Sequence, residues 1–464
     1  MRVLVLNPPG PGGVRYSRDG RCQSDEGAWL DTFPPTMLAS VAGALRAEHQ
    51  VVVTDCIGER LGMNALMERV EALDPDAVVC NTATPTIAVD MAALTAVKES
   101  CDALTLAYGE HVTARAIELL KDNPALDIAV LGEAETPVLR ALRGEERIPG
   151  TAVRGWTGEP WLEPELDTLP FPAYDLLPTY RFPLTGEPWL FVRDGRGCPY
   201  DCSFCVMPRL GGRRARFHSS DYMLDQLTWV VERLGIRLWM LWDELATLDR
   251  GRMERLCDQL VGSGLAERAR WFCTTRADRF DPSLAQRMHA AGCRMVSFGV
   301  ESGSQHVLDR CGKGITVEQV RQAVTAARDA GMHTIGHCII GLPGEDEESA
   351  RATVDLAIES GLDFAQFYTA TPFPGSAFHE EAVREGWFAD GDWESVEQGT
   401  AAVSYPHLPA ERIAELRREA YRAFYLRPRA VASVATMTTP RALLDLPRMT
   451  LGFLGWMGRS STPH

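Results

Sequence analysis

The chain has 464 residues, of which 45% are apolar and 24% charged, and its formal net charge at pH 7 is −16. This length favours two or three domains, and this composition is typical of a folded globular protein and not of a disordered one. An acidic surface repels phosphate backbones, which argues against nucleic acid as a partner and favours a small-molecule substrate.

The apolar run at the N-terminus, Val3 to Leu6, is too short for a signal peptide, and no later stretch reaches membrane-spanning length. We therefore expect a cytoplasmic protein without a membrane span. In that reducing compartment the twelve cysteines are expected to be thiols or metal ligands, not disulfides. Five of them lie in or beside apolar runs and are expected to be small buried residues; they are Cys56, Cys80, Cys273, Cys293 and Cys338.

Residues 1–146 alternate between apolar strand patterns and amphipathic helix patterns. Strands are predicted at 2–7, 50–55, 77–81, 104–108 and 128–131, and helices at 35–47, 64–73, 89–100 and 113–121. Strands separated by such helices predict right-handed crossovers and a doubly wound, Rossmann-like parallel sheet. Ligands of such sheets bind at the carboxyl ends of the strands.

Residues 147–187 contain seven prolines and show no periodicity, so we expect an extended linker between two domains. From 188 to 400 the alternation resumes. Strands are predicted at 189–193, 238–242, 271–275, 295–300, 334–340 and 364–370, and helices at 222–233, 252–261, 282–291, 317–330 and 347–359. Six such units predict a partial (β/α)6 barrel, since the eight-unit barrel needs more residues than this segment supplies.

Residues 401–464 are predicted to be helical and end in an apolar stretch, LLDLPRMTLGFLGWMG. A cap that packs on the rest of the protein is the favoured interpretation. A helix that binds a membrane surface or a partner is the alternative.

The sequence GCPYDCSFC at 197–205 places Cys198, Cys202 and Cys205 in a Cys-x3-Cys-x2-Cys pattern at the end of the first predicted barrel strand. Barrels of this kind carry their chemistry at that end. Three thiolates favour a soft metal, either zinc or an iron–sulfur cluster. A structural zinc site would require a fourth ligand nearby, and neither His218 nor Cys257 lies in such a repeat. Three cysteines on a four-iron cluster leave one iron open to another ligand.

This triplet, with the aromatic Phe204 before its third cysteine and a (β/α)6 segment after it, resembles the radical S-adenosylmethionine (SAM) superfamily. The resemblance implies a [4Fe–4S] cluster whose open iron binds SAM. It also implies a 5′-deoxyadenosyl radical that abstracts hydrogen from the substrate, and an external electron donor such as flavodoxin or ferredoxin.

The resemblance extends to polar groups at successive strand ends, in WDELAT at 242–247, FGVESGS at 298–304 and HCIIGLPGE at 337–345. Carboxylates would hold the methionyl amine, an arginine its carboxylate, and a glycine would allow the backbone to approach adenine. Taken singly, each match is equally compatible with a structural salt bridge. The SAM contacts implied are Phe204, Asp243, Glu244, Arg276, Glu301, Ser302 and Gly341.

A doubly wound domain before such a barrel resembles the cobalamin-dependent branch of this superfamily. The local matches are LNPPGPGG, FPPTMLASVAGAL, NTATPT, YGEHVT and LGEAE. They imply cobalamin contacts at Asn7, Pro8, Thr82, Thr84, Gly109, His111, Gly132 and Glu133. Ordinary turns between strands and helices also use such residues. The Asp-x-His-x-x-Gly motif of histidine-ligated cobalamin domains is missing, because Ile57 stands at the histidine position of DCIGER. We therefore expect cobalamin without histidine ligation.

The branch resemblance implies methyl transfer from methylcobalamin to an unactivated carbon of a small, natural-product type substrate. A cyclase or ring-rearranging enzyme with the same cofactors is the alternative, and a non-catalytic sensor is a third possibility from a different class. Gln366, Tyr368 and the turn at 371–376 are candidates to line the substrate cavity, although core packing would explain them as well.

Overall fold

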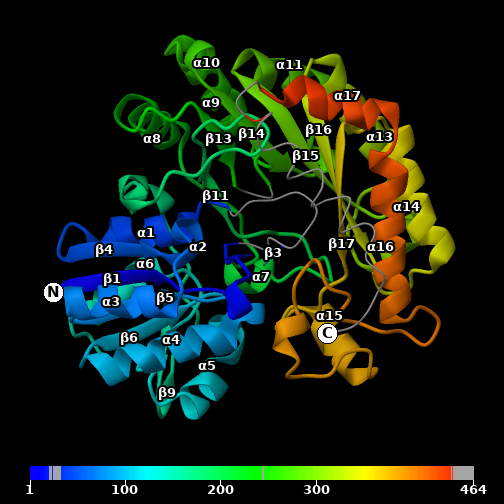
Figure 1. The fold of residues 1–464 in the computed structure, drawn as a ribbon. Helices are drawn as coiled ribbons and strands as arrows, with labels where there is room; N and C mark the ends of the chain where they lie inside the picture. The colour runs from blue at the N-terminus through cyan, green and yellow to red at the C-terminus, as the bar shows by residue number, and fades with distance from the viewer. Residues whose placement is uncertain (20–22, 25–32, 243–244, 440–441, 443–464) are drawn as a thin grey trace.

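A computed structural model describes residues 1–19, 23–24, 33–242, 245–439 and 442, and Figure 1 shows their arrangement. Two α/β halves lie side by side, one built on a seven-stranded sheet and the other on a six-stranded sheet. Within the described ranges, no helix has both the length and the apolar character needed to cross a membrane.

The first sheet is parallel over its first five strands. In spatial order they are β4 (Gln50–Asp55), β1 (Arg2–Asn7), β5 (Ala77–Asn81), β6 (Leu104–Tyr108) and β7 (Ile128–Val130). The strand order reverses direction at β1, because β4 pairs with one edge of β1 and β5 with the other. In doubly wound sheets this reversal opens a ligand crevice at the carboxyl ends of the strands.

Helices cover both faces of this sheet. They are α1 (Thr36–Leu45), α2 (Cys56–Glu59), α3 (Met63–Leu73), α4 (Ile87–Ser100), α5 (Glu110–Asp122) and α6 (Glu135–Leu142). Alternate residues of β1 enter two separate cores, with Leu4 and Leu6 in one and Val3 and Val5 in the other. A parallel strand buried on both faces has this pattern, and the predicted doubly wound fold is confirmed.

The segment 147–187, expected to be an extended linker, begins with two short strands, β8 (Thr151–Val153) and β9 (Trp156–Thr157). Strand β8 pairs antiparallel with β7, where Ala129 lies opposite Ala152, and β9 pairs with β8. Strands of three and two residues are too short to show a period-two pattern in the sequence. From Gly158 to Pro188 the structure has the 3-10 turns η3 (Leu166–Thr168) and η4 (Tyr174–Leu176) and two isolated β-bridges, Trp161 with Gly132 and Arg181 with Pro188.

The second sheet has six parallel strands in chain order, as a partial barrel requires. They are β10 (Leu190–Val192), β13 (Leu238–Leu241), β14 (Arg270–Thr275), β15 (Cys293–Glu301), β16 (His333–Ile340) and β17 (Phe364–Thr369). The helices between them are α8 (Ser220–Arg233), α9 (Arg250–Gly262), α10 (Leu265–Arg268), α11 (Pro282–Ala290), α12 (Gln305–Arg310), α13 (Val317–Asp329) and α14 (Glu347–Glu359). Among the described residues β10 and β17 do not pair, so the sheet is an open arc.

Alternate residues of the barrel strands face opposite sides. Trp239 and Trp271 pack among the surrounding helices, whereas their neighbours Leu238 and Phe272 belong to a cluster on the inner side. The five cysteines expected to be small buried residues are all buried, which confirms that prediction.

Helix α16 (Ala410–Tyr425) covers the edge strand β17, and α17 (Pro428–Met437) follows it. The hydroxyl groups of Tyr421 and Tyr425 accept hydrogen bonds from the backbone N–H groups of Phe367 and Ala365, at 3.2 and 3.1 Å. This contact satisfies backbone groups that an edge strand otherwise exposes. The apolar stretch of the tail lies outside the described residues.

The remaining short elements occupy the loops. They are β2 (Tyr16–Ser17), β3 (Gln23–Ser24), β11 (Gly195–Arg196), β12 (Arg216–Phe217), α7 (Met207–Leu210), α15 (Ala377–Arg384) and the 3-10 turns η1 (Pro11–Gly13), η2 (Thr84–Thr86), η5 (Ala277–Arg279) and η6 (Trp393–Ser395).

Candidate active site

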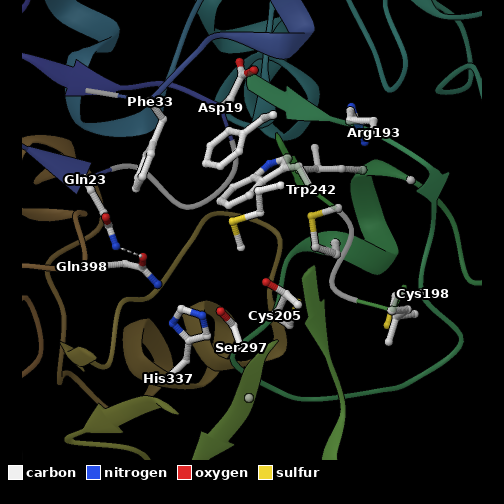
Figure 2. A pocket seen from close by; sticks show the side chains of 18 of the residues that line it. Asp19, Gln23, Phe33, Arg193, Cys198, Cys205, Trp242, Ser297, His337 and Gln398 are labelled. Carbon is white, nitrogen blue, oxygen red and sulfur yellow. Dashed lines mark hydrogen bonds between the residues drawn. The ribbon is translucent and has the colours of Figure 1, made fainter. Parts of the chain in front are cut away.

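A cavity of about 340 Å³ lies between the two halves, and both contribute to its wall (Figure 2). Residues that follow β5, β6 and β7 form one side, and the inner face of the barrel strands forms the other. The two halves therefore enclose a single space in which groups held by each can meet.

The three predicted cluster ligands line this cavity. Cys198, Cys202 and Cys205 are half-buried and lie on the loop that follows β11. Backbone hydrogen bonds fix this loop: the N–H group of Cys198 donates to Gly212 at 3.0 Å and that of Cys205 to Cys202 at 3.0 Å. The part of the chain that is described holds no group of three or more His, Cys, Asp or Glu placed for a single metal ion.

Two of the residues that the resemblance implies for SAM carry charge into the same cavity. Arg276 follows β14, stacks on the ring of Tyr200 at 3.6 Å and pairs with Asp278 at 2.9 Å. Glu301 ends β15 and forms a buried ion pair of 2.6 Å with Lys313. Glu301 has a φ of 60°, which a non-glycine residue adopts at a cost and which often marks a functional position.

Phe204 also lines the cavity and is buried at 7% exposure, between two of the cysteines in sequence. Its ring belongs to the apolar cluster of Ile339, Ile340 and Tyr368. An apolar neighbour of this kind limits access of water to the cysteine loop.

The structure does not bring Ser302 and Gly341 to the cavity. Ser302 directly follows Glu301, so its side chain points to the opposite face of the sheet. There the Ser302 hydroxyl lies 3.3 Å from the Thr353 hydroxyl on α14. Gly341 gives its N–H group to the Glu345 carboxylate, and its carbonyl oxygen accepts a hydrogen bond of 2.7 Å from Tyr405. Asp243 and Glu244 lie outside the described residues.

Four of the residues that the resemblance implies for cobalamin line the cavity; they are Thr82, Gly109, Gly132 and Glu133. Gly109 has a φ of 141°, and a Cβ atom there would collide with the carbonyl oxygen of Thr82, so only glycine suits the position. Glu133 is already engaged in ion pairs with Arg216 at 2.6 Å and Arg196 at 3.3 Å.

Asn7, Pro8, Thr84 and His111 are not part of the cavity wall. Asn7 and Pro8 bind Arg18 instead: its guanidinium donates to the Asn7 side chain at 3.0 Å and to the Pro8 carbonyl at 2.7 Å. Thr84 is fully buried in η2. His111 packs edge-on against Trp393 at 4.9 Å, and burial lowers its pKa to about 4, so it is neutral at pH 7.

Several residues of the cavity wall were not predicted. Asp19 accepts hydrogen bonds from the Met37 N–H group at 2.7 Å and the Asn81 side chain at 3.3 Å. Burial raises the pKa of its carboxyl group to about 6. Asn81 is the last residue of β5, so the strand-end rule could have found it. Asp19 lies in an irregular loop, and no sequence signal indicates it.

The barrel wall of the cavity has an apolar part and a polar part. Phe191 stacks on Trp242 at 4.1 Å, and Phe33 lies 6.0 Å from the same ring. At the other side His337 Nδ1 lies 3.0 Å from the Tyr368 hydroxyl, which donates to Gln366. Gln366 and Tyr368 line the cavity as expected, whereas no residue of the turn at 371–376 does.

A cysteine triplet at the end of the first barrel strand, open to a space shared with a doubly wound sheet, defines a class of α/β enzymes that use bound cofactors. The family model of the radical SAM superfamily matches residues 192–357. An uncharacterised methyltransferase of Pyrococcus horikoshii is 30% identical over 445 residues, which cover 93% of this chain and 94% of the relative. The chain belongs to the radical SAM superfamily and is a radical SAM enzyme with methyltransferases among its relatives.

Two further proteins are similar over most of the chain. Anaerobic magnesium-protoporphyrin IX monomethyl ester cyclase of Rubrivivax gelatinosus is 27% identical over 403 residues, 82% of this chain and 70% of the cyclase. The solved structure of TsrM from Kitasatospora setae, a radical SAM methyltransferase with cobalamin and a [4Fe–4S] cluster bound, has a TM-score of 0.70. It covers 98% of this chain and 97% of TsrM at 18% identity, which shows a shared fold. These relatives are enzymes, and the sensor hypothesis is set aside.

Proposed function

We propose that this protein is a cobalamin-dependent radical SAM methyltransferase that acts on a small molecule bound between its two halves. One observation carries the proposal. The cysteine triplet of the barrel and the strand-end residues Thr82, Gly109 and Gly132 of the doubly wound half line the same cavity. A reaction that needs both a radical and a methyl donor requires both cofactors to face one substrate.

The residues present suit the three cofactors. Cys198, Cys202 and Cys205 are half-buried and lie on one loop that faces the cavity, which suits the ligands of one cluster. Arg276 offers a cation for the SAM carboxylate, and Glu301 an anion for its amine. When bound, SAM and the cluster would supply the 5′-deoxyadenosyl radical, and cobalamin would supply the methyl group.

On the doubly wound side, two positions of the cavity wall, Gly109 and Gly132, carry no side chain, and Thr82 also lines this wall. A flat macrocycle can approach such a wall closely. His111 packs on Trp393, and within the described part of the chain the only histidine in the cavity wall is His337, on the barrel side. This arrangement supports cobalamin bound without a histidine ligand.

The wall also indicates the class of substrate. Phe191 and Trp242 offer a flat apolar surface, whereas His337 and Tyr368 offer hydrogen-bonding groups. A small molecule with a planar apolar part and at least one polar substituent suits both surfaces. Within the barrel these side chains would orient the substrate and exclude water from the radical.

Cyclisation or ring rearrangement with the same cofactors is the second candidate, because the Rubrivivax gelatinosus relative is named as a cyclase. Product analysis distinguishes the two. Methyl transfer yields S-adenosylhomocysteine, 5′-deoxyadenosine and a product in which a methyl group has replaced one hydrogen of the substrate. Cyclisation yields 5′-deoxyadenosine without S-adenosylhomocysteine.

The experiment that tests the proposal is reconstitution without oxygen, followed by incubation with SAM, a strong reductant and candidate planar substrates. We expect substrate-dependent formation of S-adenosylhomocysteine and 5′-deoxyadenosine. An electron paramagnetic resonance spectrum of the Co(II) form should lack nitrogen coupling from an axial base. Cleavage of SAM that never produces S-adenosylhomocysteine would contradict methyl transfer.

A further inference from the structure

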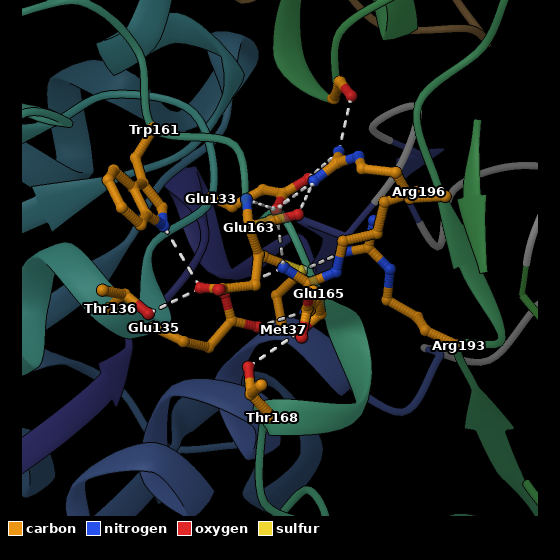
Figure 3. Close-up of polar contacts among 12 residues, drawn as sticks. Met37, Glu133, Glu135, Thr136, Trp161, Glu163, Glu165, Thr168, Arg193 and Arg196 are labelled. Carbon is orange, nitrogen blue, oxygen red and sulfur yellow. Dashed lines mark hydrogen bonds and ion pairs between the residues drawn. The ribbon is translucent and has the colours of Figure 1, made fainter. Parts of the chain in front are cut away.

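Arg193 is a cation at the junction of the two halves that the proposed chemistry does not use. It directly follows β10, the edge strand of the barrel, and lines the cavity. Helix α1 of the doubly wound half packs on this strand, and the Thr36 hydroxyl donates to the Phe191 carbonyl at 3.0 Å. Figure 3 shows Arg193 beside Met37 and Arg196.

The neighbouring guanidinium groups have strong acceptors. Arg196 donates to both carboxylate oxygens of Glu135, at 2.6 and 3.1 Å. Arg216 donates to Glu133 at 2.6 Å and to the Gly211 carbonyl at 2.7 Å. These bidentate contacts neutralise charge that is buried from water.

Arg193 differs from both. Its Nε is buried without an acceptor, and among the described residues the guanidinium donates only to the sulfur of Met37. A thioether is a weak acceptor and carries no charge. Burial lowers the pKa of Arg193 and the nearby charge of Arg196 lowers it further, whereas the charges of Glu135, Glu133 and Asp19 act in the opposite direction.

The carboxylates around Arg193 are engaged elsewhere. Glu135 is held by Arg196, and Glu133 by Arg216 and the Glu163 N–H group at 2.7 Å. Asp19 accepts from Met37 and Asn81, and no ion pair joins it to Arg193 in the described structure. Arg193 is half-buried, and its buried Nε lacks an acceptor. A buried donor without an acceptor costs free energy, so an acceptor from a ligand is the natural complement.

We propose that Arg193 binds an oxygen acceptor of the corrinoid, either a carboxamide carbonyl of the ring periphery or the phosphate of the nucleotide tail. This inference rests on the proposed function. The position favours the corrinoid over SAM, because Arg193 contacts Met37 of the doubly wound half. The candidate SAM contacts lie further along the sheet: Arg276 follows β14 and Glu301 ends β15, and β13 separates β10 from both strands. A guanidinium can donate two parallel hydrogen bonds to a phosphate, and it can donate to the single oxygen of a carboxamide carbonyl.

The test uses the full chain without corrinoid and three matched variants. Arg193→Met removes the cation that has no anionic partner, and Arg196→Met breaks the ion pair with Glu135. Arg181→Met removes an exposed arginine that lies before β10. Melting temperature is measured for each, and the dissociation constants of cobalamin and of SAM are measured separately by titration without oxygen.

For Arg193→Met we expect a melting temperature equal to or above that of the unaltered corrinoid-free protein, and cobalamin affinity weakened at least tenfold. SAM affinity should not change. Arg196→Met should melt at a lower temperature, and Arg181→Met should change neither quantity. Weakened binding of both cobalamin and cobinamide would indicate a ring carboxamide, and weakened binding of cobalamin alone would indicate the phosphate, which cobinamide lacks.

A lowered melting temperature for Arg193→Met with unchanged cobalamin affinity would overturn the inference and make Arg193 structural. Weakened SAM binding with unchanged cobalamin binding would overturn it in favour of SAM. If the unaltered protein binds no corrinoid, the proposed function fails first, and this result is distinct from both of the others.

Discussion

The guanidinium of Arg276 lies 3.6 Å from the centre of the Tyr200 ring, and this contact joins strand β14 to the cysteine loop. Tyr200 stands between Cys198 and Cys202 in sequence, and its hydroxyl accepts a hydrogen bond of 3.0 Å from Arg279. Two arginines that follow one barrel strand therefore hold the loop that carries the predicted cluster ligands. Arg276, which is proposed to bind SAM, is therefore in direct contact with the loop whose cysteines are proposed to bind iron.

We predict that Tyr200→Leu loosens this loop. A desolvated cation–π contact contributes about 1–2 kcal/mol, and a double-mutant cycle with Arg276→Met should return a coupling of about that size. Urea unfolding of the four proteins measures it. Tyr200→Phe is the control, because it keeps the ring and loses only the hydroxyl; a coupling near zero would show that the two groups do not interact.

Replacing any one of Cys198, Cys202 and Cys205 by alanine should abolish cluster assembly. Each thiolate is expected to bind one iron, and two cysteines do not retain a four-iron cluster. Iron and sulfide are counted after reconstitution without oxygen. Cys101→Ala is the matched control, since Cys101 is also half-buried but lies in the first half. Equal iron content in the control and a triplet variant would contradict the assignment.

Gly109→Ala should destabilise the doubly wound half and reduce its affinity for cobalamin. Its φ of 141° suits glycine alone, and the added methyl group would meet the Thr82 carbonyl, at a cost of about 1–3 kcal/mol. Gly62→Ala is the control, because Gly62 has an ordinary φ of −87° and open space around it. Melting curves and cobalamin titrations of both variants provide the comparison, and the prediction fails if the two variants behave alike.

The buried carboxyl group of Asp19 should make stability depend on pH. Burial raises its pKa from 3.8 to about 6, so between these values the folded protein binds more protons than the unfolded chain. The free energy of unfolding therefore falls as the pH rises from about 4 to about 6.

Asp19→Asn removes that titration. Between pH 4 and pH 7 the free energy of unfolding of the variant should rise relative to that of the unaltered protein, by about 1–3 kcal/mol in total. Urea unfolding at several pH values measures the difference. Asp76→Asn should show the opposite trend, because the Arg2 N–H group lowers the pKa of Asp76. If the difference between Asp19→Asn and the unaltered protein does not change with pH, the pKa of the Asp19 carboxyl group is not raised by folding, and the prediction is wrong.

The sequence predicted the regular elements well, because they carry strong periodic patterns. Strands 77–81 and 104–108 were predicted with the bounds of β5 and β6, and the order of strands in each sheet follows from short crossovers. The cysteine triplet was predicted from spacing alone. Strands β8 and β9 were missed because they are too short to show a period.

Outside the cysteine loop, the candidate site could be predicted where a residue lies in or directly after a strand and faces inward. Glu301 and Ser302 are neighbours in sequence, but only the first lines the cavity, because successive side chains of a strand point to opposite faces. Asp19 and Arg193 acquire their roles from contacts with Met37 and Asn81, which are distant in sequence. The contact of Arg193 depends on how the two halves pack and those of Asp19 on the folding of the first half, and no local pattern encodes either.

The most direct measurement is the metal content of protein purified without oxygen, with iron, sulfide, cobalt and zinc determined on one sample after reconstitution with hydroxocobalamin. The shared cavity predicts about four iron, about four sulfide and about one cobalt per chain. Zinc bound to the cysteine triplet, or iron without cobalt, would contradict a site built for both cofactors.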